Sequence, residues 1–225
     1  PDELTSVIRS ELIETQETYG DERRTEIVEF YSDLTDEDLI PEEDLIVTLS
    51  KEGYAKTQPI DTYQAQNRGG TGKRAASLKD EDFVSKLFVA NTHDTLLCFS
   101  SYGKVYWIKV YRLPKGGRNA KGRPIVNLLP LEKDERIQAV LPVKEFNDDQ
   151  FIFMATESGS VKKTKLSAYS RPMKTGIKAI KLRDGDRVVN AEITDGSKEI
   201  MLFSNSGKSI RFKESDARPM GRVSQ

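Results

Sequence analysis

Residues 96–103 read Leu96-Leu97-Cys98-Phe99-Ser100-Ser101-Tyr102-Gly103, an apolar run followed by a hydroxyl residue, two variable residues and a glycine. The pattern recurs in Ile46–Gly53, Ile152–Gly159 and Ile200–Gly207. A Ser or Thr at the first position of a type I turn hydrogen-bonds the local backbone, and a glycine at the fourth position takes the left-handed conformation that matches hairpin twist. Each stretch is therefore predicted to form a strand, a tight turn and the start of a second strand.

Each predicted hairpin is followed by further segments in a constant order. The strands after the turns are basic and contain Ala55-Lys56, Lys104-Val105, Val161-Lys162-Lys163 and Lys208-Ser209-Ile210-Arg211. After three of the hairpins come a short apolar strand, an acidic turn and a closing strand. The short strands are predicted at 76–78, 125–128 and 179–182, the acidic turns at 80–82, 132–134 and 184–186, and the closing strands at 84–89, 137–143 and 188–193.

The four turn glycines are 50, 56 and 48 residues apart. Four strands in roughly 50 residues is the period of a β-propeller blade, and a blade needs neighbours to bury its faces. The fold is therefore predicted to be all-β and propeller-like, with three complete repeats and the first half of a fourth. Hairpins arranged by chance in a β-sandwich are the alternative.

A different pattern precedes the repeats. Residues 3–19 predict an amphipathic helix that ends at Gly20. Its apolar face consists of Leu4, Val7, Ile8 and Leu12. Residues 20–44 are acidic and poorly periodic, as is typical of a linker. We therefore expect a helix with an acidic linker over residues 1–42 and a β domain over residues 43–225.

The net charge of −1 conceals an uneven distribution of charge. Residues 1–45 contain 3 basic and 16 acidic residues, a net charge of −13. Residues 46–225 contain 32 basic and 20 acidic residues, a net charge of +12. A basic β domain favours a polyanionic partner, and a charged surface that serves only solubility is the alternative.

Few residues are available for catalysis or for binding a metal. Cys98 is predicted to be buried in a strand and His93 to lie in a turn, and the chain has no other cysteine or histidine. No P-loop, nucleophile elbow or calcium loop is recognisable, so the acidic turns are expected to be ordinary solvated turns. No signal peptide or long apolar run occurs. These features indicate a soluble, cytoplasmic binding module rather than a self-contained enzyme.

A glycine-rich segment, Gln66-Asn67-Arg68-Gly69-Gly70-Thr71-Gly72, precedes Lys73 and Arg74. Three glycines in four positions disfavour a helix or strand interior, because glycine loses the most backbone freedom on ordering. Backbone donors beside fixed positive charge suit a phosphate, and a flexible surface turn is the alternative.

Basic residues recur between the first hairpin and the second half of each repeat. These loops contain Arg68, Lys73 and Arg74, then Lys115, Arg118, Lys121 and Arg123, then Arg171, Lys174 and Lys178. Positive charge at every repeat should follow one curved rim. That arrangement suits bent duplex DNA, held by its phosphates without base reading. We also include as predicted DNA contacts Gln66, Gly69, Gly70 and Gly72, together with the strand residues Lys162, Lys163, Lys208 and Arg211.

Several segments together resemble a known family. Gln66–Gly72 resembles the gyrase-A box, whose usual form is Gln, Arg or Lys, Arg, Gly, Gly, Arg or Lys, Gly. Further similar stretches are Asp21–Ile27, Val89–Asp94, Gly122–Pro130, Phe203–Gly207 and Arg211–Ser215. Over nearly its whole length, the chain is similar to the C-terminal region of the A subunit of bacterial DNA gyrase, a type IIA topoisomerase.

The resemblance implies a β-pinwheel, a six-bladed propeller-like disc whose adjacent blades exchange strands, of which this chain would supply about three and a half. Its rim would bind and wrap duplex DNA so that the parent enzyme introduces negative supercoils. Residues 1–30 resemble the end of the breakage-reunion domain. The tyrosine nucleophile, magnesium and ATP belong to that domain or to the gyrase B subunit of an A2B2 complex, so this part would need no cofactor and would be monomeric alone.

The box departs from the family pattern at Asn67 and Thr71, which replace residues that are usually basic. The two missing charges could weaken DNA contact, and Lys73 and Arg74 could compensate in part. The related topoisomerase IV subunit, which has a degenerate box and relaxes or decatenates DNA, is an alternative. A propeller that binds proteins and not DNA is another.

Overall fold

The computed structural model describes residues 2–27, 35, 37–62, 82–117 and 120–224. The chain forms two compact units, Pro1–Asp36 and Glu37–Gln225. The first contains the helix α1 (Asp2–Tyr19), as predicted. The helix ends where the Gly20 N–H donates to the Gln16 carbonyl at 2.8 Å, and its apolar side chains are exposed. Within the described residues, no helix is both long enough and apolar enough to cross a membrane.

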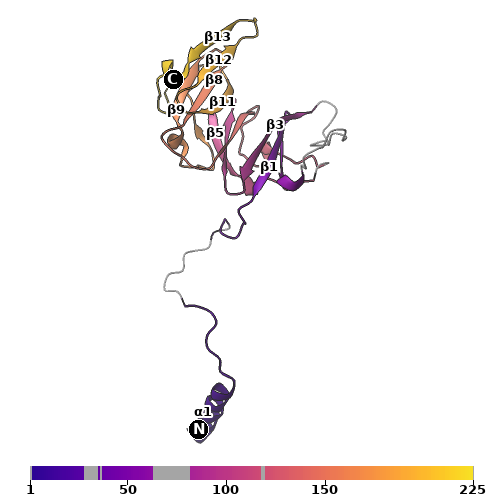
Figure 1. The fold of residues 1–225 in the computed structure, drawn as a ribbon, viewed down its shortest axis with the longest axis vertical. Coiled ribbons are helices and arrows are strands. Elements are labelled where there is room, and N and C mark those ends of the chain that lie inside the picture. Colours follow the sequence, from indigo (N-terminus) through magenta and orange to yellow (C-terminus); the bar gives the residue numbers. More distant parts are fainter. Residues whose placement is uncertain (1, 28–34, 36, 63–81, 118–119, 225) are drawn as a thin grey trace. The chain divides into compact units, whose positions relative to one another are not determined.

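The described residues of the second unit form four antiparallel sheets, here called the first to fourth blades. The first blade has the strand order β3 (Val84–Asn91), β1 (Asp44–Ser50), β2 (Tyr54–Pro59), β6 (Arg123–Pro124). The second has the order β10 (Ile177–Lys178), β5 (Lys104–Lys109), β4 (Thr95–Ser100), β7 (Ile137–Val143). The third has β11 (Val188–Thr194), β8 (Phe151–Thr156), β9 (Val161–Lys165), and the fourth pairs β12 (Glu199–Phe203) with β13 (Ser209–Lys213). Figure 1 shows the blades following one another in chain order, from purple β1 and β3 to yellow β12 and β13.

Short 3-10 helices follow the second strand of each hairpin. They are η1 (Ile60–Thr62), η2 (Val110–Arg112), η4 (Leu166–Tyr169) and η5 (Glu214–Asp216), and η3 (Ile125–Asn127) follows β6. The recurrence of strand, turn, strand and 3-10 helix in all four blades confirms the predicted repeat.

The four hairpin turns have the predicted chemistry. In each, the glycine N–H donates to the carbonyl of the hydroxyl residue at 3.0–3.1 Å, and the glycine φ lies between +74° and +85°. The hydroxyl oxygen accepts the N–H of the residue after the glycine, at 3.1–3.2 Å. The glycines are Gly53, Gly103, Gly159 and Gly207, and the hydroxyl residues are Ser50, Ser100, Thr156 and Ser204. A single turn motif therefore sets the local geometry of every blade.

Adjacent blades exchange strands, as the resemblance implied. β6 comes after β5 in the chain but pairs with β2 of the preceding blade, and β10 pairs with β5 in the same way. The predicted short strands at 125–128 and 179–182 were wrong, because the pairing is made by the two residues just before each apolar run. The partner strands β2 and β5 begin just after the turn glycines, where the chain reverses direction, so the strand pairing does not extend beyond them. Ile125 and Ala179 donate instead to the carbonyls of Gly53 and Gly103, both at 2.8 Å.

Two hydrophobic clusters fill the seams between blades. Alternate residues of β4 enter different clusters: Leu96 and Cys98 pack with residues of the first blade, and Leu97 and Phe99 with residues of the third. A strand buried on both faces reads as a continuous apolar run, which explains residues 96–99. Cys98 is buried as predicted, and burial raises the pKa of its thiol to about 12.

The closing and exchanged strands lie on opposite sides of the arc. The closing strands β7 and β11 of adjacent blades contact each other. The exchanged strands β6 and β10 lie at the other ends of their sheets. The segments that lead into β6 and β10 therefore follow the outer edge of the unit.

Two glycines with similar φ offer a test of this packing. Gly176 (φ +71°) lies so close to Tyr106 that a Cβ would come within 2.6 Å of the ring, whereas a Cβ at Gly159 (φ +82°) would meet no atom within 4 Å. Gly159→Ala should lower the free energy of unfolding by about 1 kcal/mol, the cost of the left-handed backbone alone. Gly176→Ala should lower it by about 3 kcal/mol, because overpacking is added. Urea unfolding of both variants checks this, and equal losses would contradict the packing of Gly176 on the ring.

Candidate nucleic-acid interface

Three segments, here called the exchange loops, each follow the 3-10 helix after a hairpin, and the first two lead to the outer strand of the preceding blade. The first comprises residues 113–122 between η2 and β6, and the second comprises residues 170–176 between η4 and β10. The third comprises residues 217–224 after η5. Because each follows the 3-10 helix at the same point of its repeat, the loops succeed one another along the outer edge. We call this edge, with β6 and β10, the outer rim.

The first exchange loop is fastened to β2 by its backbone and by a buried side chain. Thr57 donates its N–H to Pro114 at 2.9 Å and accepts the Gly116 N–H at 3.0 Å. The Lys56 ammonium donates to the carbonyls of Gly117 and Ala120, at 3.1 and 3.0 Å. The described part of the loop is therefore fixed to β2 at several points, unlike a mobile surface loop.

Three basic residues predicted from the sequence lie on or beside this loop. The exposed Lys115 pairs with Glu43 at 2.7 Å. The Lys121 ammonium lies 4.7 Å from the centre of the Tyr54 ring, a cation–π distance. Arg123, in β6, is exposed. The first loop therefore presents cations at the rim, one of them already held by a carboxylate.

The second exchange loop is held by aromatic side chains. The Trp107 indole N–H donates to the Tyr169 carbonyl at 2.9 Å, and Gly176 packs on the Tyr106 ring. The predicted contacts Arg171, Lys174 and Lys178 are all exposed. In the part of the chain that the structure describes, none of these three has a carboxylate within 4.0 Å. Their charges are therefore available to an external anion.

The third exchange loop adds a residue that sequence reasoning missed. Met220 donates its N–H to Lys163 at 2.8 Å, as Gly116 does to Thr57 in the first loop. Arg218 precedes this contact and is exposed, in the same position relative to η5 as Arg171 has relative to η4. The tripeptide Arg-Pro-Met occurs at both places, 171–173 and 218–220, and this repeat is the signal that would have identified Arg218.

Two predicted contacts require correction. Lys162 and Lys163 are 1% and 4% exposed, so they cannot reach an external phosphate. The Lys162 ammonium donates to the carbonyls of Ala179, Arg222 and Ser224. The Lys163 ammonium donates to the Glu214 carbonyl at 3.0 Å and lies 3.7 Å from its carboxylate. Both lysines are buried because β9 is covered by the third loop on one side and by η5 on the other.

The remaining predicted contacts divide into two groups. Lys208 and Arg211 are exposed on the fourth blade, and Arg211 pairs with Glu199 at 3.2 Å. Eight residues lie outside the described part of the chain: Gln66, Arg68, Gly69, Gly70, Gly72, Lys73, Arg74 and Arg118. The role of the glycine-rich box therefore stays a prediction.

Residues 37–43, at the end of the acidic N-terminal segment, pack against the second blade and the first exchange loop. Glu37 pairs with Lys109 and Glu43 with Lys115, each at 2.7 Å. Between them, the Ile40 carbonyl lies 2.8 Å from Nε2 of His93, which is in a turn as predicted. Carboxylates of this segment therefore hold cations at or near the rim.

The acidic turns also have a structural role that was not predicted from the sequence. Asp82 is 8% exposed and accepts the Glu52 N–H at 3.1 Å, and Asp186 accepts the Ser158 N–H at 3.0 Å. Each carboxylate thus fastens its turn to a hairpin turn of the same repeat. Among the described residues, no group of three or more His, Cys, Asp or Glu is arranged to hold a metal ion.

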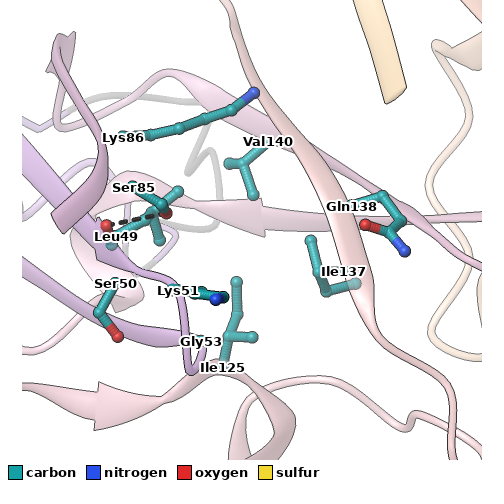
Figure 2. A pocket seen from close by; sticks show the side chains of 10 residues that line it. All are labelled: Leu49, Ser50, Lys51, Gly53, Ser85, Lys86, Ile125, Ile137, Gln138 and Val140. Atoms are coloured by element: carbon teal, nitrogen blue, oxygen red, sulfur yellow. Dashed lines mark hydrogen bonds between the residues drawn. The ribbon is translucent and has the colours of Figure 1, made fainter. Parts of the chain in front are cut away.

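A pocket of about 210 Å³ opens in the seam between the first two blades. Figure 2 shows its lining side chains, which come from β1 and the turn after it, β3, η3 and β7, and the hydrogen bond from Ser85 to the Leu49 carbonyl. Lys51 and Lys86 are its charged lining residues, and its lining contains no acidic side chain. The pocket thus has no acid–base pair, and we assign it to blade packing.

Comparison with known proteins supports the repeat and the fold. A family profile described as the DNA gyrase C-terminal domain, beta-propeller, matches residues 44–91, 94–144, 150–195 and 198–225. The four matches coincide with the four repeats of the chain, so β6 and β10 fall within the match after the blade that they complete. Among solved structures, the C-terminal domain of DNA topoisomerase IV superposes with a TM-score of 0.71 and 31% identity, over 82% of this chain and 56% of that one. A DNA gyrase A C-terminal domain gives 0.61 and 30%, over 81% and 59%.

Full-length relatives share much higher sequence identity. The DNA gyrase A protein of Aeromonas salmonicida is 59% identical over 98% of this chain and 24% of that protein. The DNA gyrase A protein of Salmonella typhimurium is 56% identical over 99% and 25%. The chain therefore spans about a quarter of the length of these relatives.

The buried amine of Lys162 predicts a pH dependence of stability. Burial, with the nearby charge of Arg222, lowers the pKa of Lys162 from 10.5 to about 8. The folded chain then binds this proton less tightly than the unfolded chain, so the free energy of unfolding should rise as the pH passes from 8 towards 10.5. Between pH 7 and 9, the stability of the parent chain relative to Lys162→Met should rise by at most about 1 kcal/mol, since water screens part of the effect.

Urea unfolding at a series of pH values measures this difference. Lys181→Met, at an exposed lysine, is the control and should show a flat difference over the same range. A difference for Lys162→Met that is flat or falls with pH would show that its amine is not perturbed in this way.

Proposed function

This chain belongs to the DNA gyrase C-terminal domain family, and on that premise we propose that it binds duplex DNA along the outer rim. The observation that carries the proposal is the recurrence of exposed basic side chains on successive exchange loops. Cations at fixed points of a repeating edge neutralise phosphates, which carry no base identity. Binding is therefore independent of base sequence.

The curvature of the blade series makes wrapping the natural mode of binding. Smooth bending of a 20–30 bp site costs on the order of 1–6 kcal/mol, so a wrapping surface needs many phosphate contacts. Arg171, Lys174 and Lys178 offer charge without a carboxylate partner in the described chain, whereas Lys115 must exchange Glu43 for a phosphate. An exposed ion pair of this kind is worth about 1 kcal/mol or less, so the exchange is feasible.

In the complete protein, wrapping would present a DNA segment for strand passage and so support ATP-dependent negative supercoiling. The relatives are DNA gyrase A proteins, of which this chain matches about a quarter. The tyrosine nucleophile, magnesium and ATP would then belong to the remaining parts and to the gyrase B protein, in an A2B2 assembly in the cytoplasm. The present chain would then bind the DNA and contribute no catalytic residue of its own.

A role in a topoisomerase IV subunit is the second candidate. It is favoured by the higher TM-score of the topoisomerase IV domain, 0.71 against 0.61 for the gyrase domain. Sequence identity favours gyrase, since the gyrase A relatives reach 56–59% whereas the topoisomerase IV domain has 31%. Identity over the whole chain is the stronger argument, because related propellers share their blade geometry.

The affinity of the chain for duplex DNA should fall steeply with salt. Replacing Arg171, Lys174 and Lys178 by alanine should reduce the slope of log K against log salt by about 2 to 3, since each phosphate contact contributes about 0.9. The matched control replaces Lys133, Arg136 and Lys144, which are exposed and lie outside the exchange loops. It removes the same charge and should leave the slope nearly unchanged. A flat salt dependence of the parent chain would exclude phosphate-based binding.

In the full-length protein assembled with gyrase B, the assay is topology. We expect negative supercoiling of relaxed plasmid with ATP. The Arg171, Lys174 and Lys178 triple alanine variant should lose supercoiling more than ATP-independent relaxation, because wrapping sets the handedness of strand passage. Relaxation and decatenation without supercoiling by the parent protein would favour the second candidate.

A further inference from the structure

Two buried lysines lie beneath the exchange loops. Lys56 in β2 is 2% exposed and Lys162 in β9 is 1% exposed. Each stands three residues after a turn glycine, Gly53 or Gly159. They therefore occupy the same place in the first and third blades, and both amines donate to carbonyls of a loop that arrives from the next repeat.

Lys56 forms the floor of the first exchange loop. Its ammonium donates to the carbonyls of Gly117 and Ala120, at 3.1 and 3.0 Å. Its stem packs beneath two glycines: a Cβ at Gly116 would lie 3.6 Å from Cδ of Lys56, and one at Gly122 would lie 3.2 Å from its Cβ. The loop backbone is therefore wrapped closely over the lysine.

Lys162 has the same relation to the third exchange loop. Its ammonium donates to the carbonyls of Ser224, at 2.9 Å, and of Arg222. It also donates to Ala179, immediately after β10, at 3.1 Å. A single buried cation thus joins segments of two successive repeats.

These hydrogen bonds determine which backbone groups face outward. In a trans peptide, the C=O and the following N–H point in opposite directions. The inward carbonyl of Ala120 therefore turns the Lys121 N–H away from the core, and that of Arg222 does the same for the Val223 N–H. Neither of these two N–H groups has a hydrogen-bond partner within the described residues. Outward N–H groups beside basic side chains form a phosphate site.

We infer that Lys56 and Lys162 are positioning residues of the DNA-binding rim, which turn the N–H groups of Lys121 and Val223 toward backbone phosphates. The inference rests on the proposed function and adds backbone donors to the cations already described. The second blade has a different arrangement. Tyr106 occupies the equivalent position, its hydroxyl donates to Glu135 at 3.0 Å, and its ring supports the loop at Gly176.

The test compares Lys56→Met and Lys162→Met with Tyr106→Phe in the 225-residue chain. Tyr106→Phe removes a buried hydrogen bond at the equivalent strand position and keeps the ring under the loop, so it is a matched control for reduced stability. Affinity for a duplex of mixed sequence, about 40 bp long and so longer than the 20–30 bp of a single bent site, is measured against salt. The measurement is made below the unfolding range of every variant. For each phosphate that a methionine variant no longer binds, the slope should fall by about 0.9, and the control should keep the parent slope.

Amide hydrogen exchange distinguishes a positioning role from a purely structural one, because a purely structural role would leave the protection of these amides by DNA unchanged. In the parent chain, the duplex should slow exchange at the Lys121 and Val223 amides. This protection should disappear at Lys121 in Lys56→Met and at Val223 in Lys162→Met. The measurement on the parent chain stands even where a variant fails to fold.

The outcomes separate the inference from the proposed function. A parent chain whose affinity does not depend on salt would overturn the proposed function itself. A steep parent slope that both methionine variants retain, with melting temperatures lowered, would show that the lysines serve folding alone. Absence of protection at both amides in the parent chain would overturn the inference in the same way.

Discussion

The exchange of strands between blades is the constraint on which the rest of the structure depends. A blade has two apolar faces and cannot bury them alone, so its stability requires neighbours. Here the neighbours are also joined by backbone hydrogen bonds, because β6 and β10 complete the sheets of the preceding blades. To supply an exchanged strand, the chain must run from one blade back to the preceding one, and so it crosses the outer edge once per repeat. The exchange loops, and with them the rim, follow from this crossing.

The electrostatics of the molecule are organised around the same crossings. Exposed cations lie on the exchange loops, buried cations lie beneath two of them, and the carboxylate of Glu43 holds Lys115 on the first. A buried ammonium is tolerated only where hydrogen bonds replace its water, and the loop carbonyls supply these bonds. Positive charge therefore has two functions here. In the proposed function, the exposed cations bind an external anion; the buried cations hydrogen-bond the backbone of the loops that carry the exposed cations.

The fold could be predicted from the sequence to a large extent because its signals are local. Ser100 and Gly103 are three residues apart, and the turn they form needs no information from elsewhere in the chain. The predicted strands at 125–128 and 179–182 failed because their ends depend on where the partner strand of another blade begins. Lys162 and Lys163 were assigned to the rim because the sequence shows only that they are basic. Their burial depends on segments more than 50 residues away in the chain.

The sequence by itself determined the hairpin repeat, the helix before it, the separation of acidic and basic segments and the resemblance to the gyrase A C-terminal region. These are properties of short segments, governed by turn chemistry, periodicity and composition. Only the tertiary structure decided which strand completes which sheet, which lysines face solvent and which lie beneath a loop. Those outcomes depend on contacts between repeats, because a side chain becomes buried where the backbone of another repeat covers it.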